Sequence, residues 1–154
     1  MIDVDVAIVG AGPVGLTCAN LLGAAGVSCL VIEQQVGTSA HPRAQTIDDE
    51  SLRTLQSFGL AQRFLASTLT ADGSAYMDGN GECFARIGPG PRNFGFAKRN
   101  YMLQQQLDAQ LLENLAQYSS VQLRFGTRLE SFAQDHDAVA LKITDRTGQR
   151  DIRA

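Results

Sequence analysis

The chain has 154 residues, of which 44% are hydrophobic and 19% charged, a composition typical of one globular domain with a buried core. Lys and Arg total 13 against 16 for Asp and Glu, and the resulting net charge of −3 argues against a nucleic-acid partner. No apolar run reaches the ~18 residues that a membrane span needs, and the N-terminus lacks the basic start of a secretory signal, so we expect a cytoplasmic protein with no membrane contact.

The first predicted elements form a strand–turn–helix–strand unit. Residues 4–9 are nearly all apolar after Asp5, as in a parallel strand that is buried on both faces. A glycine-rich turn occupies residues 10–15, residues 14–25 predict a helix, and residues 27–33 predict a second buried strand. This order is the first half of a doubly wound fold.

The middle of the chain predicts helices and a hairpin. Residues 34–42 are polar and predict a loop, and residues 46–58 predict a helix that stops at a glycine. Residues 60–67 predict a second short helix. Residues 73–86 predict two strands around a turn at Asp78-Gly79-Asn80-Gly81.

The last third predicts one helix and a run of β structure. Asn100 is a plausible N-cap, and leucines at four-residue steps give the next helix one apolar face: Leu103, Leu107, Leu111 and Leu115. Apolar residues alternate over residues 121–125 and again over 139–143, which predicts strands. The fold class is therefore α/β, with a Rossmann-type βαβ unit, an inserted helical and hairpin segment, and an antiparallel β run, all in a single domain over residues 1–154.

The turn Gly10-Ala11-Gly12-Pro13-Val14-Gly15 matches the pattern GxGxxG. Gly10 permits a tight turn, Gly12 lets the backbone approach a pyrophosphate, and Gly15 lets the helix pack close to the strand. Pro13 suits the first turn of a helix, because its missing N–H would have no intrahelical partner there. The pattern predicts a dinucleotide site with the pyrophosphate at the helix N-terminus. The alternative is a tight structural turn with no ligand.

Glu33 ends the second predicted strand, where a carboxylate can accept hydrogen bonds from a ribose diol. The same carboxylate disfavours a 2′-phosphate by like-charge repulsion, so the site suits FAD or NAD better than NADP. These residues alone do not choose between FAD and NAD.

Three blocks of the chain carry a family pattern. Residues 10–33 read GxGxxGxxxAxxLxxxG, then an apolar strand and an acid; residues 41–56 read HPRAQTIDDESLRTLQ; residues 101–108 read YMLQQQLD. The first block resembles FAD-dependent oxidoreductases. The second and third resemble class A flavoprotein monooxygenases, of the 3-(3-hydroxyphenyl)propionate hydroxylase type. Departures in the third block are Gln105 for the family's proline and Asp108 for its glutamate.

The resemblance implies FAD as cofactor, NAD(P)H as reductant and hydroxylation of a small phenolic substrate with O2. It implies that Arg43 lies near the flavin diphosphate, where a guanidinium can fork onto phosphate oxygens, and that Gln104 binds the ribityl chain. The cofactor-binding residues that we expect are Gly10, Ala11, Gly12, Pro13, Gly15, Glu33, Gln34, Arg43 and Gln104. No catalytic residue is assigned and no metal site is expected.

The family's later DG and GD motifs are missing from the 154 residues, so we expect the N-terminal part of a larger hydroxylase, inactive by itself. Three alternatives stay open: another FAD enzyme such as an epoxidase or dehydrogenase, an NAD-dependent dehydrogenase, and a non-catalytic nucleotide-binding remnant. The aromatic substrate, the choice between NADH and NADPH, and the oligomeric state also stay open.

Overall fold

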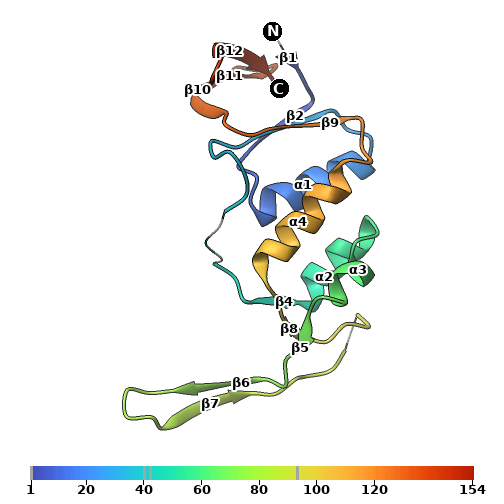
Figure 1. The fold of residues 1–154 in the computed structure, drawn as a ribbon, viewed down its shortest axis with the longest axis vertical. Helices are drawn as coiled ribbons and strands as arrows, with labels where there is room; N and C mark the ends of the chain where they lie inside the picture. Colours follow the sequence, from blue (N-terminus) through green and yellow to red (C-terminus); the bar gives the residue numbers. More distant parts are fainter. Residues whose placement is uncertain (1, 40, 42, 93) are drawn as a thin grey trace. The chain divides into compact units, whose positions relative to one another are not determined.

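The structure is a computed structural model that describes residues 2–39, 41, 43–92 and 94–154. The chain divides into two compact units, whose elements are labelled in Figure 1. Unit 1 is made of residues 1–41 and 108–154, and unit 2 of residues 42–107. The prediction that all of these residues form a single domain stays a prediction.

A three-stranded parallel sheet forms the centre of unit 1. Its strands are β2 (Val6–Val9), β3 (Cys29–Ile32) and β9 (Val121–Arg124), in the order β2-β3-β9 (Figure 1). Helix α1 (Pro13–Ala24) connects β2 to β3. The predicted strand–turn–helix–strand unit is thus present, and all four residues of β3 are buried as expected.

The prediction that residues 4–9 are buried on both faces is wrong. Only the last four of them form β2, and Val9 is 57% exposed. The physical reason is that β2 lies at the edge of the sheet as the structure describes it, so fewer neighbours cover it than cover the central strand β3.

A second sheet in unit 1 contains four strands, in the order β1-β12-β11-β10. They are β1 (Ile2–Asp3), β10 (Arg128–Gln134), β11 (Val139–Asp145) and β12 (Gly148–Arg153). The last three form an antiparallel meander, and β1 joins it by parallel pairing with β12. The two sheets share a core of six buried residues: Val4, Leu30, Ile32, Leu141, Ile143 and Ile152.

The predicted antiparallel β run differs from the structure in two places. The sequence predicts that residues 121–125 belong to it, but β9 pairs in parallel with β3, with Cys29 opposite Val121. A helix directly before a strand provides the crossover that parallel pairing requires, and α4 (Gln104–Leu115) fills that role here. Strand β10 was missed, because most of its residues are exposed and leave no clear alternation.

A buried amide connects α1 to the part of α4 that belongs to unit 1. Asn20 is 0% exposed, and its Nδ2 donates to the carbonyls of Leu16 at 2.8 Å and Leu111 at 3.1 Å. Asn114 Nδ2 donates to Asn20 Oδ1 at 2.8 Å. Both ends of the Asn20 amide are therefore satisfied, as a buried polar group requires.

Unit 2 combines two short helices with a small antiparallel sheet. The helices are α2 (Asp49–Ser57) and α3 (Ala61–Leu65). The sheet has the order β4-β8-β5, with β4 (Thr46–Asp48), β5 (Leu69–Thr70) and β8 (Arg99–Tyr101).

Two predictions in unit 2 are wrong at their boundaries. Residues 46–48 form β4 rather than helix, because the β-branched Thr46 and Ile47 suit a strand and Asp48 is a strong helix cap. Asn100 is not an N-cap: it lies in the middle of β8, and its Nδ2 donates to the Ala97 carbonyl at 3.0 Å. Pairing of β8 with β4 and β5 overrides the local capping preference.

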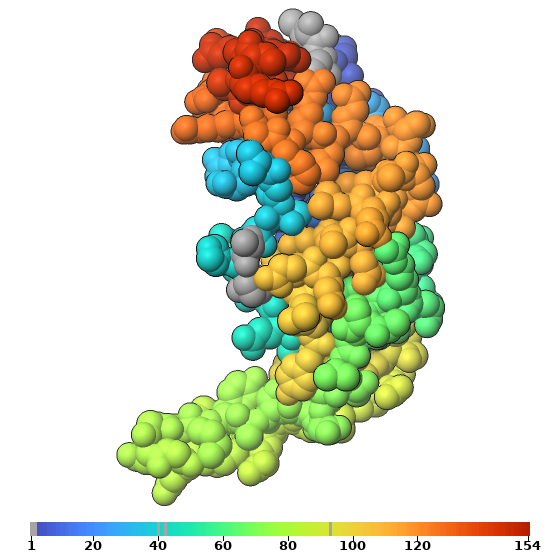
Figure 2. Space-filling view, in the orientation of Figure 1, coloured from blue at the N-terminus to red at the C-terminus, as the bar shows by residue number. Residues whose placement is uncertain are grey.

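The predicted hairpin is confirmed as β6 (Ser74–Met77) and β7 (Cys83–Ile87), paired antiparallel. Asp78 Oδ1 accepts hydrogen bonds from the backbone N–H groups of Asn80 and Glu82, which shapes the turn. The hairpin stands away from the helices of unit 2 (Figures 1 and 2). As a result, the side chains of Tyr76 and Phe84 remain exposed beside each other, with ring centroids 6.3 Å apart.

Candidate functional site: a glycine turn and a carboxylate in unit 1

Two of the three glycines in the turn after β2 are required by the fold itself. Gly10 has a φ of +106°, which favours glycine. A Cβ on Gly15 would lie 2.0 Å from the carbonyl oxygen of Gly10 and 3.3 Å from Ile8 Cγ2, so α1 could not start so close to the strand. The physical tasks that the sequence suggests for these two glycines are confirmed.

Gly12 differs from the other two. Its φ is −84°, and a Cβ built on it would meet no atom within 4 Å among the described residues. Neither backbone strain nor packing against the described residues therefore requires glycine at this position. The remaining reason for a glycine is space for an approaching ligand, as expected where a backbone contacts a pyrophosphate.

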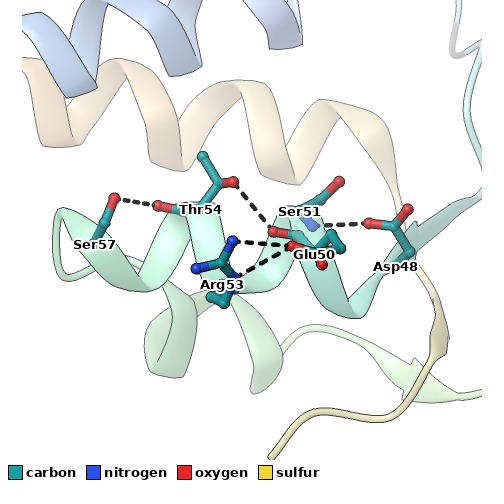
Figure 3. Close-up of polar contacts among 6 residues, drawn as sticks. All are labelled: Asp48, Glu50, Ser51, Arg53, Thr54 and Ser57. Atoms are coloured by element: carbon teal, nitrogen blue, oxygen red, sulfur yellow. Dashed lines mark hydrogen bonds and ion pairs between the residues drawn. The ribbon is translucent and has the colours of Figure 1, made fainter. Parts of the chain in front are cut away.

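The start of α1 is open to an anion. Among the residues that the structure describes, no side chain caps it; its first turn contains no acid, and Pro13 occupies its first position. The start of α2 shows the contrast: Asp48 Oδ1 accepts a hydrogen bond of 2.8 Å from Ser51 N, and Asp49 and Glu50 lie in the first turn (Figure 3). The positive end of the α2 dipole is thus satisfied internally, whereas that of α1 is left for an external group.

Glu33 directly follows β3 and is half-buried beside the glycine turn. Its Oε2 accepts a hydrogen bond of 3.0 Å from Ala11 N, and its Oε1 accepts one of 2.8 Å from Gln35 N. An ionised carboxylate has about four acceptor positions, so both oxygens keep capacity for a further donor. The structure therefore places Glu33 where it holds the turn and can also accept from a ligand hydroxyl.

A pocket of about 280 Å³ lies at the carboxyl ends of the parallel strands. It is lined by Val9, Gly10, Ile32, Glu33, Gln34, Thr127, Arg128 and Leu129. Pockets for complete drug-sized ligands measure roughly 300–1,000 Å³, so this one suits part of a dinucleotide. Ligands bind at this end of the strands in open α/β sheets.

The segment after β9 contributes to the pocket and was not predicted. Its backbone is tied to the β3 side of the pocket, because Thr127 N donates to the Glu33 carbonyl at 2.9 Å and Gly126 N donates to the Gln35 carbonyl at 2.8 Å. Recognising residues 121–124 as a parallel strand would have identified Arg128 as a candidate, since neighbouring parallel strands end at the same edge of a sheet.

The structure brings Arg43 and Gln104 together in unit 2. Gln104 is the first residue of α4 and is 5% exposed, and its Oε1 accepts hydrogen bonds from the backbone N–H of Arg43 at 2.8 Å and of Ala44 at 3.1 Å. The Arg43 side chain is exposed and pairs with no group among the described residues. Its contact with a diphosphate and the ribityl contact of Gln104 stay predictions.

Comparison with known proteins identifies the family of this chain. A family model described as "FAD binding domain" matches residues 3–154, so the chain belongs to the FAD binding domain family. The choice left open by the sequence pattern, FAD or NAD, is thereby decided for FAD. The glycine turn, the uncapped start of α1 and the carboxylate of Glu33 fit this cofactor.

Curated relatives include the 3-(3-hydroxy-phenyl)propionate/3-hydroxycinnamic acid hydroxylase of Escherichia coli O8 (strain IAI1), which is 44% identical over 150 residues. The corresponding protein of Shigella sonnei (strain Ss046) is 43% identical over 149 residues. Each alignment covers 97% of this chain but only 27% of the relative, so the chain spans about a quarter of these proteins' length.

Solved structures give the same assignment. The p-nitrophenol 4-monooxygenase PnpA of Pseudomonas putida DLL-E4 superposes with a TM-score of 0.89 at 29% identity, covering 100% of this chain and 40% of that one. The flavin-dependent monooxygenase PieE, solved in complex with FAD and substrate, superposes with a TM-score of 0.83 at 32% identity, covering 99% and 29%. The predicted α/β fold class and the resemblance to class A flavin monooxygenases are confirmed.

None of the helices in the described part of the chain is long and apolar enough to cross a bilayer. Over the same residues, no group of three or more His, Cys, Asp and Glu side chains is arranged to hold a metal ion.

Proposed function

We propose that this chain binds FAD and forms the FAD-binding part of a monooxygenase that hydroxylates a phenolic or related aromatic compound. NAD(P)H is the reductant, and O2 supplies one oxygen atom to the ring and one to water. The protein acts in the cytoplasm. Support comes from the family, from relatives named hydroxylases at 43–44% identity, and from neighbouring structures named monooxygenases.

The observation that carries the proposal is Gly12. Nothing in the described chain requires a glycine there, yet a side chain would occupy the space in front of an uncapped helix start. A diphosphate fits this position, because it is anionic and must approach the backbone closely. Ala11, Pro13 and Gly15 complete the turn that presents this surface.

The remaining roles follow from the positions of the side chains. Glu33, with Gln34 beside it, accepts hydrogen bonds from the adenosine ribose. Arg43 neutralises the diphosphate, and Gln104 binds the ribityl chain. When bound, the flavin supplies the electron transfer and oxygen activation, and the protein residues hold and orient it.

Calorimetric titration of the 154-residue chain with FAD, FMN, NAD and NADP tests this proposal. We expect FAD to bind at least tenfold more tightly than FMN, which lacks the adenosine half, and NADP to bind most weakly. Glu33→Ala should reduce the affinity for FAD and leave the affinity for FMN nearly unchanged. Tighter binding of NAD than of FAD would contradict the proposal and favour a dehydrogenase.

A further inference from the structure

Unit 2 contains a pocket of its own, with a volume of about 220 Å³. It is bounded by the start of α2, the chain between β5 and β6, the loop after β7 and the start of β8. Apolar walls come from Ala71, Ile87 and Pro89. A cavity of about 150 Å³ is large enough to hold a benzene ring. The pocket therefore has room for one aromatic ring with a small substituent.

Asp49 is unusual among the residues that line this pocket, because its carboxylate is buried without a partner. The residue is 7% exposed, and among the residues that the structure describes none donates a hydrogen bond to its side chain or forms an ion pair with it. Arg99 lines the same pocket, but its Nη1 donates to Ser74 Oγ at 2.7 Å. Buried polar groups are nearly always hydrogen-bonded, so a carboxylate without a donor requires an explanation.

The folding of α2 does not explain this buried carboxylate. Asp48 supplies the N-cap, since its Oδ1 accepts the hydrogen bond of 2.8 Å from Ser51 N (Figure 3). Glu50 places another acid in the same first turn, where it is exposed to solvent. A favourable interaction with the helix dipole is therefore available without burial. The remaining reason to bury Asp49 is a ligand that donates to it.

The charges around the pocket favour a neutral ligand. Asp48 and Asp49 are balanced by Lys98 and Arg99, so these four side chains have no net formal charge. A ligand that fits has an apolar ring for the walls and one strong hydrogen-bond donor for the carboxylate. A phenol has both, and a hydroxyl group that donates to a carboxylate forms a charge-assisted hydrogen bond.

We infer that this pocket of unit 2 binds the phenolic ring of the substrate, with the carboxylate of Asp49 accepting a hydrogen bond from the ring hydroxyl. Because the substrate of the proposed function is a phenolic compound, this assignment rests on that function. Asp49 binds the substrate, and its carboxylate, which has no donor in the free protein, gains one when the phenol enters.

Titration of the 154-residue chain with phenol and with anisole tests this hydrogen bond. Anisole has the same ring, but a methyl group replaces the hydroxyl proton. Two-dimensional NMR should show that phenol shifts the amide signals of Asp49, Ala71 and Lys98. Phenol should bind at least about tenfold more tightly than anisole, as the loss of a hydrogen bond to a carboxylate predicts. Equal affinities, or unchanged signals at all three amides, would overturn the inference.

Substitution of Asp49 separates a binding role from a structural one. In Asp49→Leu the preference for phenol over anisole should disappear, whereas Glu50→Gln, a change at an exposed acid of the same turn, should keep it. Asp49→Leu should also raise the unfolding midpoint, because an apolar side chain replaces a buried carboxylate without a partner. Asp49→Asn keeps the shape and a neutral acceptor, so it should retain part of the preference. A lower midpoint in both Asp49 variants would show a structural role and overturn the inference.

This inference and the proposed function can fail separately. Titration with FAD reports on the cofactor-binding residues, which do not include Asp49. If the chain binds FAD but does not prefer phenol to anisole, only the inference fails. If Asp49 gives the chain a preference for phenol but FAD does not bind, the pocket is a phenol site and the proposed function fails.

Discussion

The three glycines of the turn after β2 serve different purposes, although they look alike in the sequence pattern. Gly10 adopts a positive φ, and a Cβ on Gly15 would lie only 2.0 Å from the Gly10 carbonyl oxygen. Gly12 has an ordinary backbone conformation and open space beside it. Substitution of each should therefore affect a different property of the protein.

We predict that Gly15→Ala lowers the free energy of unfolding, since the added methyl group forces α1 away from β2. Overpacking of this kind costs roughly 1–3 kcal/mol. Gly12→Ala should leave the unfolding midpoint within about 1 °C and weaken FAD binding at least tenfold. Thermal denaturation and FAD titration of both variants measure the two effects. A destabilised Gly12→Ala variant would show that the glycine has a structural role.

Cys29 is the most perturbed thiol. Burial in β3, and to a lesser extent the neighbouring Cys18, raises its pKa to about 11. Cys18 and Cys83 are exposed. Iodoacetamide at pH 8 should therefore modify two thiols in the folded chain and three after denaturation, as counted by mass spectrometry. Rapid modification of folded Cys29 would contradict this.

The same thiol makes stability depend on pH in a defined window. In the unfolded chain Cys29 ionises near its ordinary pKa of 9.0, while in the folded chain it stays protonated to about pH 11. Its contribution is thus fully present below pH 9 and is lost as the pH rises toward 11. Urea denaturation should show a smaller fall in stability between pH 8 and 10 for Cys29→Ala than for the original chain.

At the scale of elements, α1 depends on a second close approach. A Cβ on Gly23 would lie 2.6 Å from the Cδ2 and Cγ atoms of Tyr118, the ring that follows α4. Alanine favours a helix over glycine by about 1 kcal/mol, but a clash with a ring in contact costs more. Gly23→Ala should therefore lower the unfolding midpoint by several degrees.

Removing the ring provides the control for this prediction. In a Tyr118→Ala background, Gly23→Ala should stabilise the chain, because only the helix propensity remains. A destabilising effect that persists without the ring would mean that something other than Tyr118 requires the glycine.

Strong local signals explain which elements could be predicted from the sequence. The β2–α1–β3 unit has a long apolar strand pattern, a glycine turn and a positive-φ glycine at position 26, and its prediction is confirmed. Elements whose existence depends on distant pairing were assigned wrongly or missed. Asn100 looks like a cap but pairs in β8, and β10 becomes a strand only because β11 lies beside it.

The residues of the candidate site divide in the same way, into those that local sequence signals predict and those that depend on contacts between distant segments. Gly10, Gly12, Gly15 and Glu33 could be found because their spacing along one βαβ unit determines their positions in space. Arg128, and the hydrogen bonds that Gln104 accepts from the backbone of residues 43 and 44, could not be found in this way. Each depends on a contact between segments more than 50 residues apart in the sequence. Identification of Arg43 and Gln104 came from resemblance to a family, and their roles remain predictions.

At the scale of the whole molecule, the chain matches a FAD-binding family over residues 3–154 while spanning 27% of its curated relatives. The central claim is that these residues bind the cofactor at the glycine turn. The visible absorption spectrum of the chain, recorded after addition of excess FAD and removal of free cofactor, tests it most directly. We predict a retained flavin spectrum shifted by the protein, and a colourless but folded Gly12→Val variant. A folded original chain that retains no flavin would contradict the account.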